Sequence, residues 1–327
     1  MMKTDILSML RKSDGYVSGQ QLCERFHVSR TAVWKVMEQL KEEGYRIEAV
    51  RSRGYRLSES PDILSVAEIE SRISTRWAGR NVSSFRETDS TNVQARRLGE
   101  AGAPHGTLVA ADAQSGGRGR RGRQWESPPG RDIYMSLLLR PQIPAAQAPM
   151  LTLVMALAVA DALREQTGVD ARIKWPNDIV ARGRKLCGIL TEMSADMDGV
   201  RYVVIGVGIN VNGTGFPEEI QERATSLALE SGRRFLRPAL IAAVLEKFEA
   251  RYDKFMKEGD LSGLRDDYNA LLVNVGEQVR ILEPGHEYNA ISSGINGKGE
   301  LLVTREDGRQ EAVFAGEVSV RGIYGYV

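Results

Sequence analysis

Apolar residues recur at helical spacing near the start of the chain. Leu22 and Phe26 mark a short amphipathic segment, which Ser18 can cap. A longer segment follows the turn at residues 27–29, with Ser29 as its cap and Gly44 as its end. Its apolar face has the spacing i, i+3, i+4, i+7 and consists of Val33, Val36, Met37 and Leu40. This pattern predicts two helices joined by a short turn, the arrangement of a helix-turn-helix.

The residues after this helix pair alternate in polarity and turn at residues 52–54, which predicts a β-hairpin. Together these elements predict a winged helix-turn-helix in residues 1–60, a segment with eleven Lys or Arg against eight Asp or Glu. The side chains placed to contact DNA lie at the start of the second helix and on the hairpin: Ser29, Arg30, Thr31, Lys35, Arg51 and Arg53. A protein-interaction role for the same unit is the alternative.

The pattern of apolar and polar residues after residue 57 indicates a linker followed by two further regions. The polar segment 58–65 is interpreted as a linker, and helical and strand patterns then mix up to residue 268 without regular β-α-β alternation. This mixture predicts an α+β domain around a mixed or antiparallel sheet. From residue 273, short strand patterns between glycine turns predict a small β-barrel of the SH3-like kind. We therefore expect an α+β multidomain protein divided into residues 1–60, 61–270 and 271–327.

Composition narrows the class of protein. The 327 residues are 42% hydrophobic and carry 44 Lys or Arg against 43 Asp or Glu, so no overall positive field marks a nucleic-acid binder. Cys23 and Cys187 are too few and too far apart for a disulfide framework or a thiolate metal site. The apolar run 150–160 is too short to span a bilayer and is expected to be a buried helix, and the first ten residues lack a signal-peptide core. We expect a cytoplasmic protein that does not enter the membrane.

Four arginines lie in the glycine-rich stretch GGRGRRGRQWESPPG, residues 116–130. Gly117, Gly119 and Gly122 satisfy the G-x-G-x-x-G pattern of dinucleotide-binding folds, but two prolines follow where that fold needs a helix. The stretch is therefore predicted to be a mobile cationic loop whose glycines let the backbone approach an anion. Solvated surface charge is the alternative.

Three further stretches carry polar groups next to strand patterns. ETDSTN, residues 87–92, offers hydroxyl and amide groups at a helix start, where an N-cap is the simpler explanation. In KWPNDIVARGRKLCGIL, residues 174–190, Asn177 and Asp178 are expected to be exposed at a bend, and Lys185 to point into a site that Gly188 keeps open. A charged hairpin end with a bulge is the alternative there. GVGINVN, residues 206–212, places glycines on an apolar strand that a flat ligand can approach.

The motifs TDSTN, GRGRRGRQW, KWPNDI, KLCGIL and GVGINVN, in this order, resemble those of the biotin protein ligases. With a winged helix in front and a small barrel behind, the whole chain is similar to the bifunctional bacterial type, which also represses the biotin operon. The resemblance implies a class II synthetase-like catalytic domain. It also implies that ATP, with Mg²⁺, converts biotin to biotinyl-5′-AMP, and that the biotinyl group then passes to a lysine of the biotin carboxyl carrier protein of acetyl-CoA carboxylase.

The resemblance assigns roles to individual residues. The implied catalytic residues are Lys185, Arg118, Arg120 and Asp178, of which Asp178 either binds Mg²⁺ or accepts a proton from the attacking lysine. The implied biotin-binding residues are Ser90, Thr91, Asn92, Gln114, Gly117, Arg118, Gly119, Arg120, Lys185, Gly188, Leu190 and Gly206. The implied nucleotide-binding residues are Arg121, Arg123, Trp125, Lys174, Asn177 and Asn210. One departure is Ala224, because some relatives place a tryptophan against the adenine there.

The resemblance finally implies regulation. The loop 116–125 is expected to be disordered without ligand and to fold over the adenylate, shielding it from water. The adenylate is the expected corepressor: the occupied protein forms a homodimer that binds two-fold operator DNA. Two alternatives remain, a biotin-sensing transcription factor without catalysis and a ligase of the lipoate type.

Overall fold

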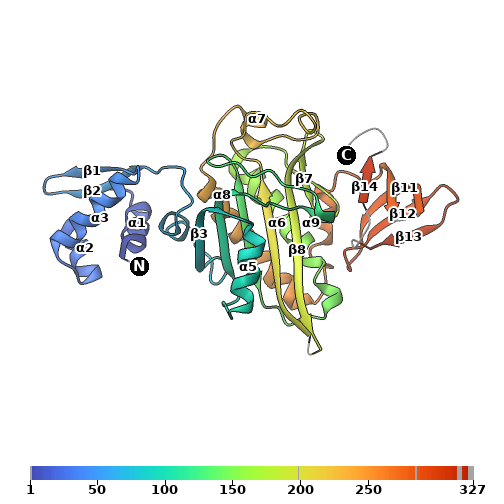
Figure 1. Ribbon diagram of the computed structural model, residues 1–327, viewed down its shortest axis with the longest axis horizontal. Coiled ribbons are helices and arrows are strands. Elements are labelled where there is room, and N and C mark those ends of the chain that lie inside the picture. Colours follow the sequence, from blue (N-terminus) through green and yellow to red (C-terminus); the bar gives the residue numbers. More distant parts are fainter. Residues whose placement is uncertain (1, 198, 284–285, 315–318, 323–327) are drawn as a thin grey trace.

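Three structural units follow one another along the longest axis of the molecule in the computed structural model (Figure 1). The structure describes residues 2–197, 199–283, 286–314 and 319–322. A helical unit with a small hairpin lies at one end, a small β-sheet at the other, and a larger unit of sheet and helices between them. This succession agrees with the predicted α+β multidomain architecture. The residue limits of the three domains stay predictions.

The N-terminal unit confirms the winged helix-turn-helix. Its elements are α1 (Met2–Lys12), α2 (Gly19–Phe26), α3 (Arg30–Glu42), β1 (Arg46–Val50) and β2 (Gly54–Glu59). Ser18 and Gln21 form a complete capping box on α2, and Ser29 caps α3 through the amide of Ala32. The predicted apolar face of α3 is buried. α1 was not predicted from the sequence, and its apolar face completes the core of this unit.

The central unit is built on a seven-stranded sheet with the order β3-β4-β5-β9-β8-β7-β6. β3 and β4 are parallel and flank α5, while all other neighbours are antiparallel, so the sheet is mixed as predicted. The elements are α4 (Val66–Glu70), β3 (Asn81–Thr88), α5 (Thr91–Glu100), β4 (Thr107–Gln114), β5 (Ile133–Leu139), α6 (Met150–Thr167), β6 (Arg172–Lys174), β7 (Asp178–Ala181), β8 (Arg184–Asp196), β9 (Gly199–Ile209), α7 (Leu227–Ser231), α8 (Arg237–Glu258) and α9 (Arg265–Leu271).

Alternate side chains of the central strands point to opposite faces of this sheet. On β4, Leu108 and Ala110 belong to the large core that includes α6 and α8, whereas Val109 packs in a smaller cluster with Ala95 of α5. The stretch Ala145–Thr167 is long and apolar enough to cross a membrane, but 67% of its most apolar window is buried inside the protein. The apolar run is therefore the buried core helix that the sequence predicts.

The C-terminal unit is a five-stranded antiparallel sheet with the order β13-β12-β11-β10-β14. Its strands are β10 (Gln278–Glu283), β11 (His286–Ile295), β12 (Leu301–Arg305), β13 (Gln310–Val313) and β14 (Ser319–Gly322). They agree with the predicted small β domain, although residues 315–318 and 323 of the last predicted strand segment lie outside the described residues. Trp175 Nε1 donates a hydrogen bond to the carbonyl of Gly299 at 3.1 Å, which joins this unit to the central one.

The connection between the first two units is short and held by a buried charge. Residues 58 and 59 of the predicted linker belong to β2, so only residues 60–65 lead to α4. Glu68 on α4 is fully buried, and its carboxylate accepts hydrogen bonds from Arg11 (2.8 Å), Arg72 (2.6 Å) and the hydroxyl of Tyr45 (2.7 Å). Because removing one partner of a buried carboxylate is costly, this cluster holds the winged helix against the central unit.

Candidate active site

Strand pairing places five residues in one row across the central sheet. Tyr134, Gly208, Gly188, Asp178 and Lys174 are successive partners on β5, β9, β8, β7 and β6. Directly paired residues share one face of a sheet, so the side chains of Tyr134, Asp178 and Lys174 face the same way. The two glycines leave the middle of the row without side chains, and a carboxylate and an ammonium group stand at its end.

The glycines of this floor were predicted to leave room for a ligand, and in the structure two of the protein's own side chains lie against them. A Cβ atom at Gly206 would lie 2.1 Å from Asn92 Oδ1. At Gly188 and Gly208, a Cβ atom would lie 2.9 and 2.6 Å from the indole of Trp125. The missing side chains therefore let two of the protein's own side chains approach the sheet closely.

A buried polar network lies at the start of α5. Ser136 Oγ is within hydrogen-bond distance of Thr91 Oγ1 (2.8 Å) and Asn92 Oδ1 (2.6 Å). Gln114 Oε1 accepts a hydrogen bond from the amide of Thr91 at 2.8 Å. Ser90 occupies the N-cap position, but its side chain makes no capping hydrogen bond. Capping therefore does not explain its hydroxyl, which borders the cavity described below.

Lys185 and Asp178 form an ion pair at the opposite end of the site. Lys185 Nζ lies 2.7 Å from Asp178 Oδ1 and 5.4 Å from the centre of the Trp125 ring. Lys185 thus points into the site as predicted. Asn177 and Asp178 were predicted to be exposed, which is wrong: both are half-buried, because the arginine loop packs over the bend that carries them.

Arg120 brings a partly desolvated positive charge to this end. Its Nη1 donates a hydrogen bond to Asn177 Oδ1 at 2.9 Å. Burial lowers the pKa of the Arg120 guanidinium, as do the like charges of Arg121 and Arg123, while Asp178 opposes the shift. A lowered arginine pKa means that the cation is destabilised where it stands. An anion entering beside Arg120 would relieve that destabilisation.

The arginine loop folds back on itself instead of starting a helix. Gly119 N donates to the carbonyl of Arg123 at 2.7 Å, and Trp125 N to the carbonyl of Gly117 at 2.9 Å. Between them lies only the short 3₁₀ turn η1 (Arg120–Gly122), which confirms that this is no dinucleotide-binding fold. Gly117 is needed for closure, because a Cβ atom there would lie 2.4 Å from the Trp125 carbonyl oxygen.

These groups line one cavity of about 480 Å³. Of the residues assigned above to catalysis, biotin or nucleotide, only Gly117 does not border the cavity. Those that do are Ser90, Thr91, Asn92, Gln114, Arg118, Gly119, Arg120, Arg121, Arg123, Trp125, Lys174, Asn177, Asp178, Lys185, Gly188, Leu190, Gly206 and Asn210. The structure thus brings together segments that lie more than one hundred residues apart. The role of each residue stays a prediction.

Two walls of this cavity were not predicted from the sequence motifs. Arg131 and Asp132 lie between the loop and β5, where an Arg-Asp pair before an apolar strand is the signal available in the sequence. The second wall is the irregular segment 216–224, which periodicity does not detect. Lys185 N donates to the carbonyl of Arg223 at 2.7 Å, and Ala224 forms an isolated bridge with Lys185. Ala224, the departure noted above, therefore lies beside the candidate catalytic lysine.

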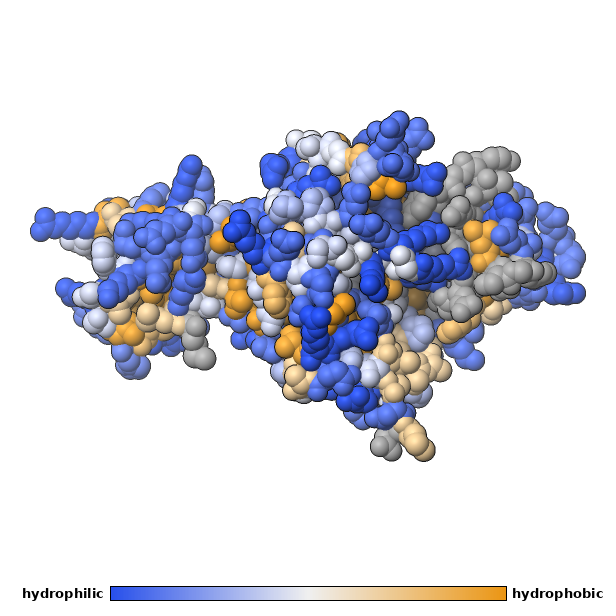
Figure 2. All heavy atoms as spheres, in the orientation of Figure 1, coloured by the Kyte–Doolittle hydropathy of each residue, from blue (hydrophilic) through white to orange (hydrophobic). Residues whose placement is uncertain are grey.

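A second functional surface lies on the N-terminal unit. The predicted DNA-contacting residues are all exposed: Ser29, Arg30, Thr31, Lys35, Arg51 and Arg53. Two other wing arginines, Arg46 and Arg56, instead pair with Glu59 and Glu48. Trp34 on α3 was not predicted as a surface residue, and it is 54% exposed. Figure 2 shows the visible face of this unit largely covered by hydrophilic side chains, as suits contact with a polar partner.

Three family models match successive parts of the chain. Residues 3–56 match an HTH domain, residues 84–210 the biotin/lipoate A/B protein ligase family, and residues 275–321 the biotin protein ligase C-terminal domain. The bifunctional ligase/repressor BirA of Bacillus subtilis is 39% identical over 94% of this chain and 95% of its own length. The protein of the same name from Escherichia coli is 32% identical over 93% and 92%.

Solved structures give the same result. The biotin protein ligase from Aquifex aeolicus, in complex with biotin and ATP, superposes with a TM-score of 0.66 at 34% identity. The match covers 74% of this chain and 99% of that one, so the remaining quarter is additional to it. The relatives that match over nearly the full length carry the ligase and repressor names together. The chain therefore belongs to the biotin protein ligase family, in the bifunctional form that joins a helix-turn-helix domain to the ligase.

Proposed function

We propose that this protein activates biotin with ATP and transfers the biotinyl group to a lysine of the biotin carboxyl carrier protein of acetyl-CoA carboxylase. One observation carries the proposal: a single cavity combines a sheet floor that contains glycines, a buried polar end and a cluster of cations. Such a cavity suits a ligand that has an apolar body, hydrogen-bonding groups and an anionic reacting end. The matched structure holds biotin and ATP, which supports these two substrates.

The chemistry needs positive charge at the cationic end. A carboxylate oxygen of biotin attacks the α-phosphorus of ATP, an O–P bond forms, and pyrophosphate leaves with the electrons of the broken P–O bond. Both reactants are anions, so Lys185, Arg118 and Arg120 offset their repulsion and the charge that develops. The neutral amine of the carrier lysine then attacks the carbonyl carbon, AMP leaves, and the amine loses a proton.

The remaining residues divide between the two substrates. We assign the polar head and apolar body of biotin to the network at the start of α5, to the sheet floor and to the near part of the loop: Ser90, Thr91, Asn92, Gln114, Gly117, Gly119, Gly188, Leu190 and Gly206. We assign the nucleotide to Arg121, Arg123, Trp125, Lys174, Asn177 and Asn210. The side chain of Ala224 is too small to cover the adenine. We assign this contact to Trp125, an aromatic residue of the cavity wall.

Asp178 has two proposed roles. Among the described residues, no three His, Cys, Asp or Glu side chains cluster to hold a metal ion. Mg²⁺ that is carried mainly by phosphate and water needs only one or two protein carboxylates, so Asp178 in the cavity fits such an ion. The alternative role is acceptance of the proton from the carrier lysine. In either role the Lys185 ammonium lies next to this carboxylate, with Nζ 2.7 Å from Asp178 Oδ1.

The same protein is proposed to repress transcription of biotin synthesis and transport genes. The exposed cations on α3 and at the hairpin tip suit the phosphates of operator DNA. Repression by a homodimer requires a self-complementary surface. β7 pairs with β8 only as far as Gly188, so in the described part of the chain the following residues of β8 have no strand on that side. An open edge of this kind can pair with its copy.

Analytical ultracentrifugation with and without biotin plus ATP tests the dimer. A larger species only with both substrates is the expected result. A monomer at concentrations that saturate DNA contradicts this coupling. The proposed location is the cytoplasm, where ATP, carrier protein and DNA are all present.

Mass spectrometry of the purified protein after incubation with biotin and MgATP tests the ligase proposal. Retained biotinyl-5′-AMP is the expected product, and lipoate serves as the control acid. Because the matching family model covers both biotin and lipoate ligases, lipoyl-AMP is the product that would favour the second function. Biotin binding without any adenylate would identify a sensor without catalysis.

A further inference from the structure

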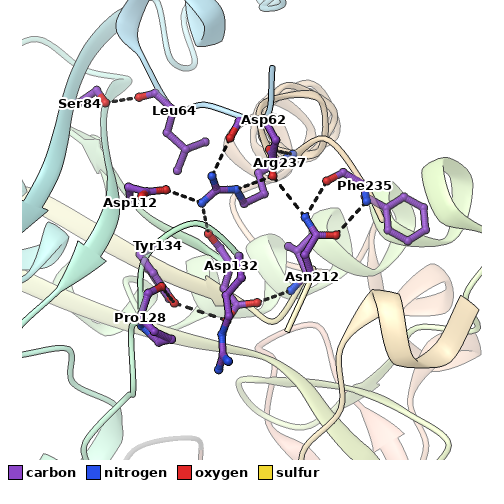
Figure 3. A network of polar contacts seen from close by, with 12 residues as sticks. Asp62, Leu64, Ser84, Asp112, Pro128, Asp132, Tyr134, Asn212, Phe235 and Arg237 are labelled. Atoms are coloured by element: carbon purple, nitrogen blue, oxygen red, sulfur yellow. Dashed lines mark hydrogen bonds and ion pairs between the residues drawn. The ribbon is translucent and has the colours of Figure 1, made fainter. Parts of the chain in front are cut away.

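Arg237, the first residue of α8, is only 1% exposed although its side chain carries a full charge. Figure 3 shows its guanidinium between groups from separate segments of the chain. Nε donates to Asp62 Oδ2 at 3.0 Å and Nη2 to the Asp62 carbonyl at 2.9 Å. Nη1 donates to Asp112 Oδ1 at 2.7 Å and to the Asp132 carbonyl at 3.2 Å. A buried cation with this many partners fixes their relative positions.

One side of this network is the wall of the cavity. Asp132 Oδ1 accepts a hydrogen bond from the amide of Val211 at 2.8 Å, and the carbonyl of Arg131 accepts one from the amide of Asn212 at 2.8 Å. These bonds hold the chain just after β9 against the chain just before β5. Arg131, Asp132 and Asn210 all border the cavity. Arg237 therefore stands directly behind a part of the cavity wall that includes Asn210, which we assign to the nucleotide.

The other side of the network is the linker to the winged helix. Asp62 lies in the segment 60–65, and its Oδ1 accepts a hydrogen bond from the Arg237 amide at 2.8 Å. Its Oδ2 also lies 3.3 Å from Asn212 Nδ2 (Figure 3). Asn212 is fixed further by two hydrogen bonds with the backbone of Phe235, each 2.9 Å long. One linker carboxylate thus binds both the start of α8 and the segment that follows Asn210.

We propose that Arg237 is a positioning residue for the nucleotide side of the site, and that Asp62 makes the linker part of the same wall. The proposal rests on the function proposed above. Because Arg237 and Asn212 share the Asp62 carboxylate, a displaced linker moves the wall, and a ligand that fixes the wall fixes the linker. Coupling of two equilibria is reciprocal, so adenylate formation and the position of the winged helix influence each other through these bonds.

The variant Asp62→Ala tests this proposal with little damage to the fold. Arg237 keeps Asp112 and the Asp132 carbonyl, so its charge stays paired. We expect the KM for ATP in biotin-dependent adenylation to rise about fivefold or more, at the lower end of coupling between sites. The KM for biotin should change less than about twofold, because the Asp62 carboxylate bonds to Arg237 and Asn212, neither of which we assign to biotin. Arg237→Lys keeps the charge but loses the forked donor. It should likewise raise the KM for ATP and leave the KM for biotin nearly unchanged.

Asp161→Ala is the matched control. Asp161 pairs with Arg251, about four turns further along α8 than Arg237. Its side chain is 24% exposed against 22% for Asp62. A general loss of stability would affect both variants alike, whereas the proposal predicts an unchanged KM for ATP in the control. An Asp62→Ala protein with the kinetics of the control contradicts the proposal. So does an equal rise of both KM values, which would indicate a merely structural role.

DNA binding gives a second readout. A duplex selected from a random pool by the wild-type protein is the probe, titrated with and without biotin plus ATP. The gain in affinity that the substrates cause should shrink at least about threefold in Asp62→Ala, and stay unchanged in Asp161→Ala. An unchanged gain in Asp62→Ala overturns the link to the winged helix. If wild-type protein forms no adenylate, the proposed function is wrong instead, and calorimetric titration of both variants with ATP still tests the positioning role.

Discussion

The winged helix and the ligase cavity place their functional residues in opposite ways. The side chains predicted to contact DNA lie at one helix start and one hairpin tip, and all are exposed. The cavity takes its residues from six strands, the start of α5, a loop and an irregular segment. Ser90, Thr91 and Asn92 are each less than a tenth exposed. A surface of the first kind depends on local rules of capping and turns. A site of the second kind depends on the register of the sheet.

The sharpest test of this difference is Lys185→Ala. We expect adenylate formation to fall by about 10²–10³-fold, because a positive charge next to the reacting anions is lost. DNA binding without ligand should stay as in the wild type, since the winged helix is built locally. Pyrophosphate exchange and a DNA titration measure the two effects. Lys247→Ala, which removes a surface lysine paired with Glu165, is the control and should be active.

Arg120→Gly tests the loop as a lid. Removing this half-buried cation should release reactive adenylate, so labelling of a bystander protein should increase on the order of tenfold. Biotinylation of surface lysines on added serum albumin measures the release. Arg80→Gly, on the surface before β3, serves as the control. Labelling that stays confined to the carrier protein counts against the lid.

Trp34→Ala tests the exposed surface of the winged helix. We expect DNA affinity to fall by about 5- to 20-fold while the salt dependence stays the same, because the indole carries no charge. Lys35→Ala should instead lower the slope of log affinity against log salt by about one unit. Both variants should form adenylate at the normal rate. A changed adenylation rate in either would show that the two regions are not separable in this way.

The smallest expected effect concerns pH. His105 Nδ1 accepts a hydrogen bond from the amide of Arg140 at 2.9 Å, and its ring lies 4.4 Å from that of Trp77. Burial lowers the pKa of His105, although Asp253 opposes the shift. The unfolded chain therefore binds more protons than the folded one below its ordinary pKa of ~6.5, and stability falls as the pH drops through this region. Tm should fall by about 2 °C more in the wild type than in His105→Gln between pH 7 and 5.5, as thermal melts would show. An identical pH response in both proteins contradicts this assignment.

The sequence by itself determined most of the architecture. Apolar spacing and capping residues gave the helix pair and hairpin correctly, and the apolar run 150–160 gave a core helix. These features depend on neighbours within a few residues, which is why a pattern detects them. Of the first unit only α1, with its buried Ile6, Leu7 and Leu10, was not predicted.

For the site, the sequence indicated the candidate residues, and the tertiary structure decided which of them lie next to one another and how deeply they are buried. The pairing of Gly208, Gly188 and Asp178 across three strands exists only once the sheet has formed. Packing of the loop likewise decided that Asn177 and Asp178 are half-buried and that Trp125 fills the space over the glycines. The contact of Asp62 with Arg237 joins residues 175 positions apart. Local sequence patterns do not predict such contacts, because long-range packing alone determines which segments meet and which side chains they bury.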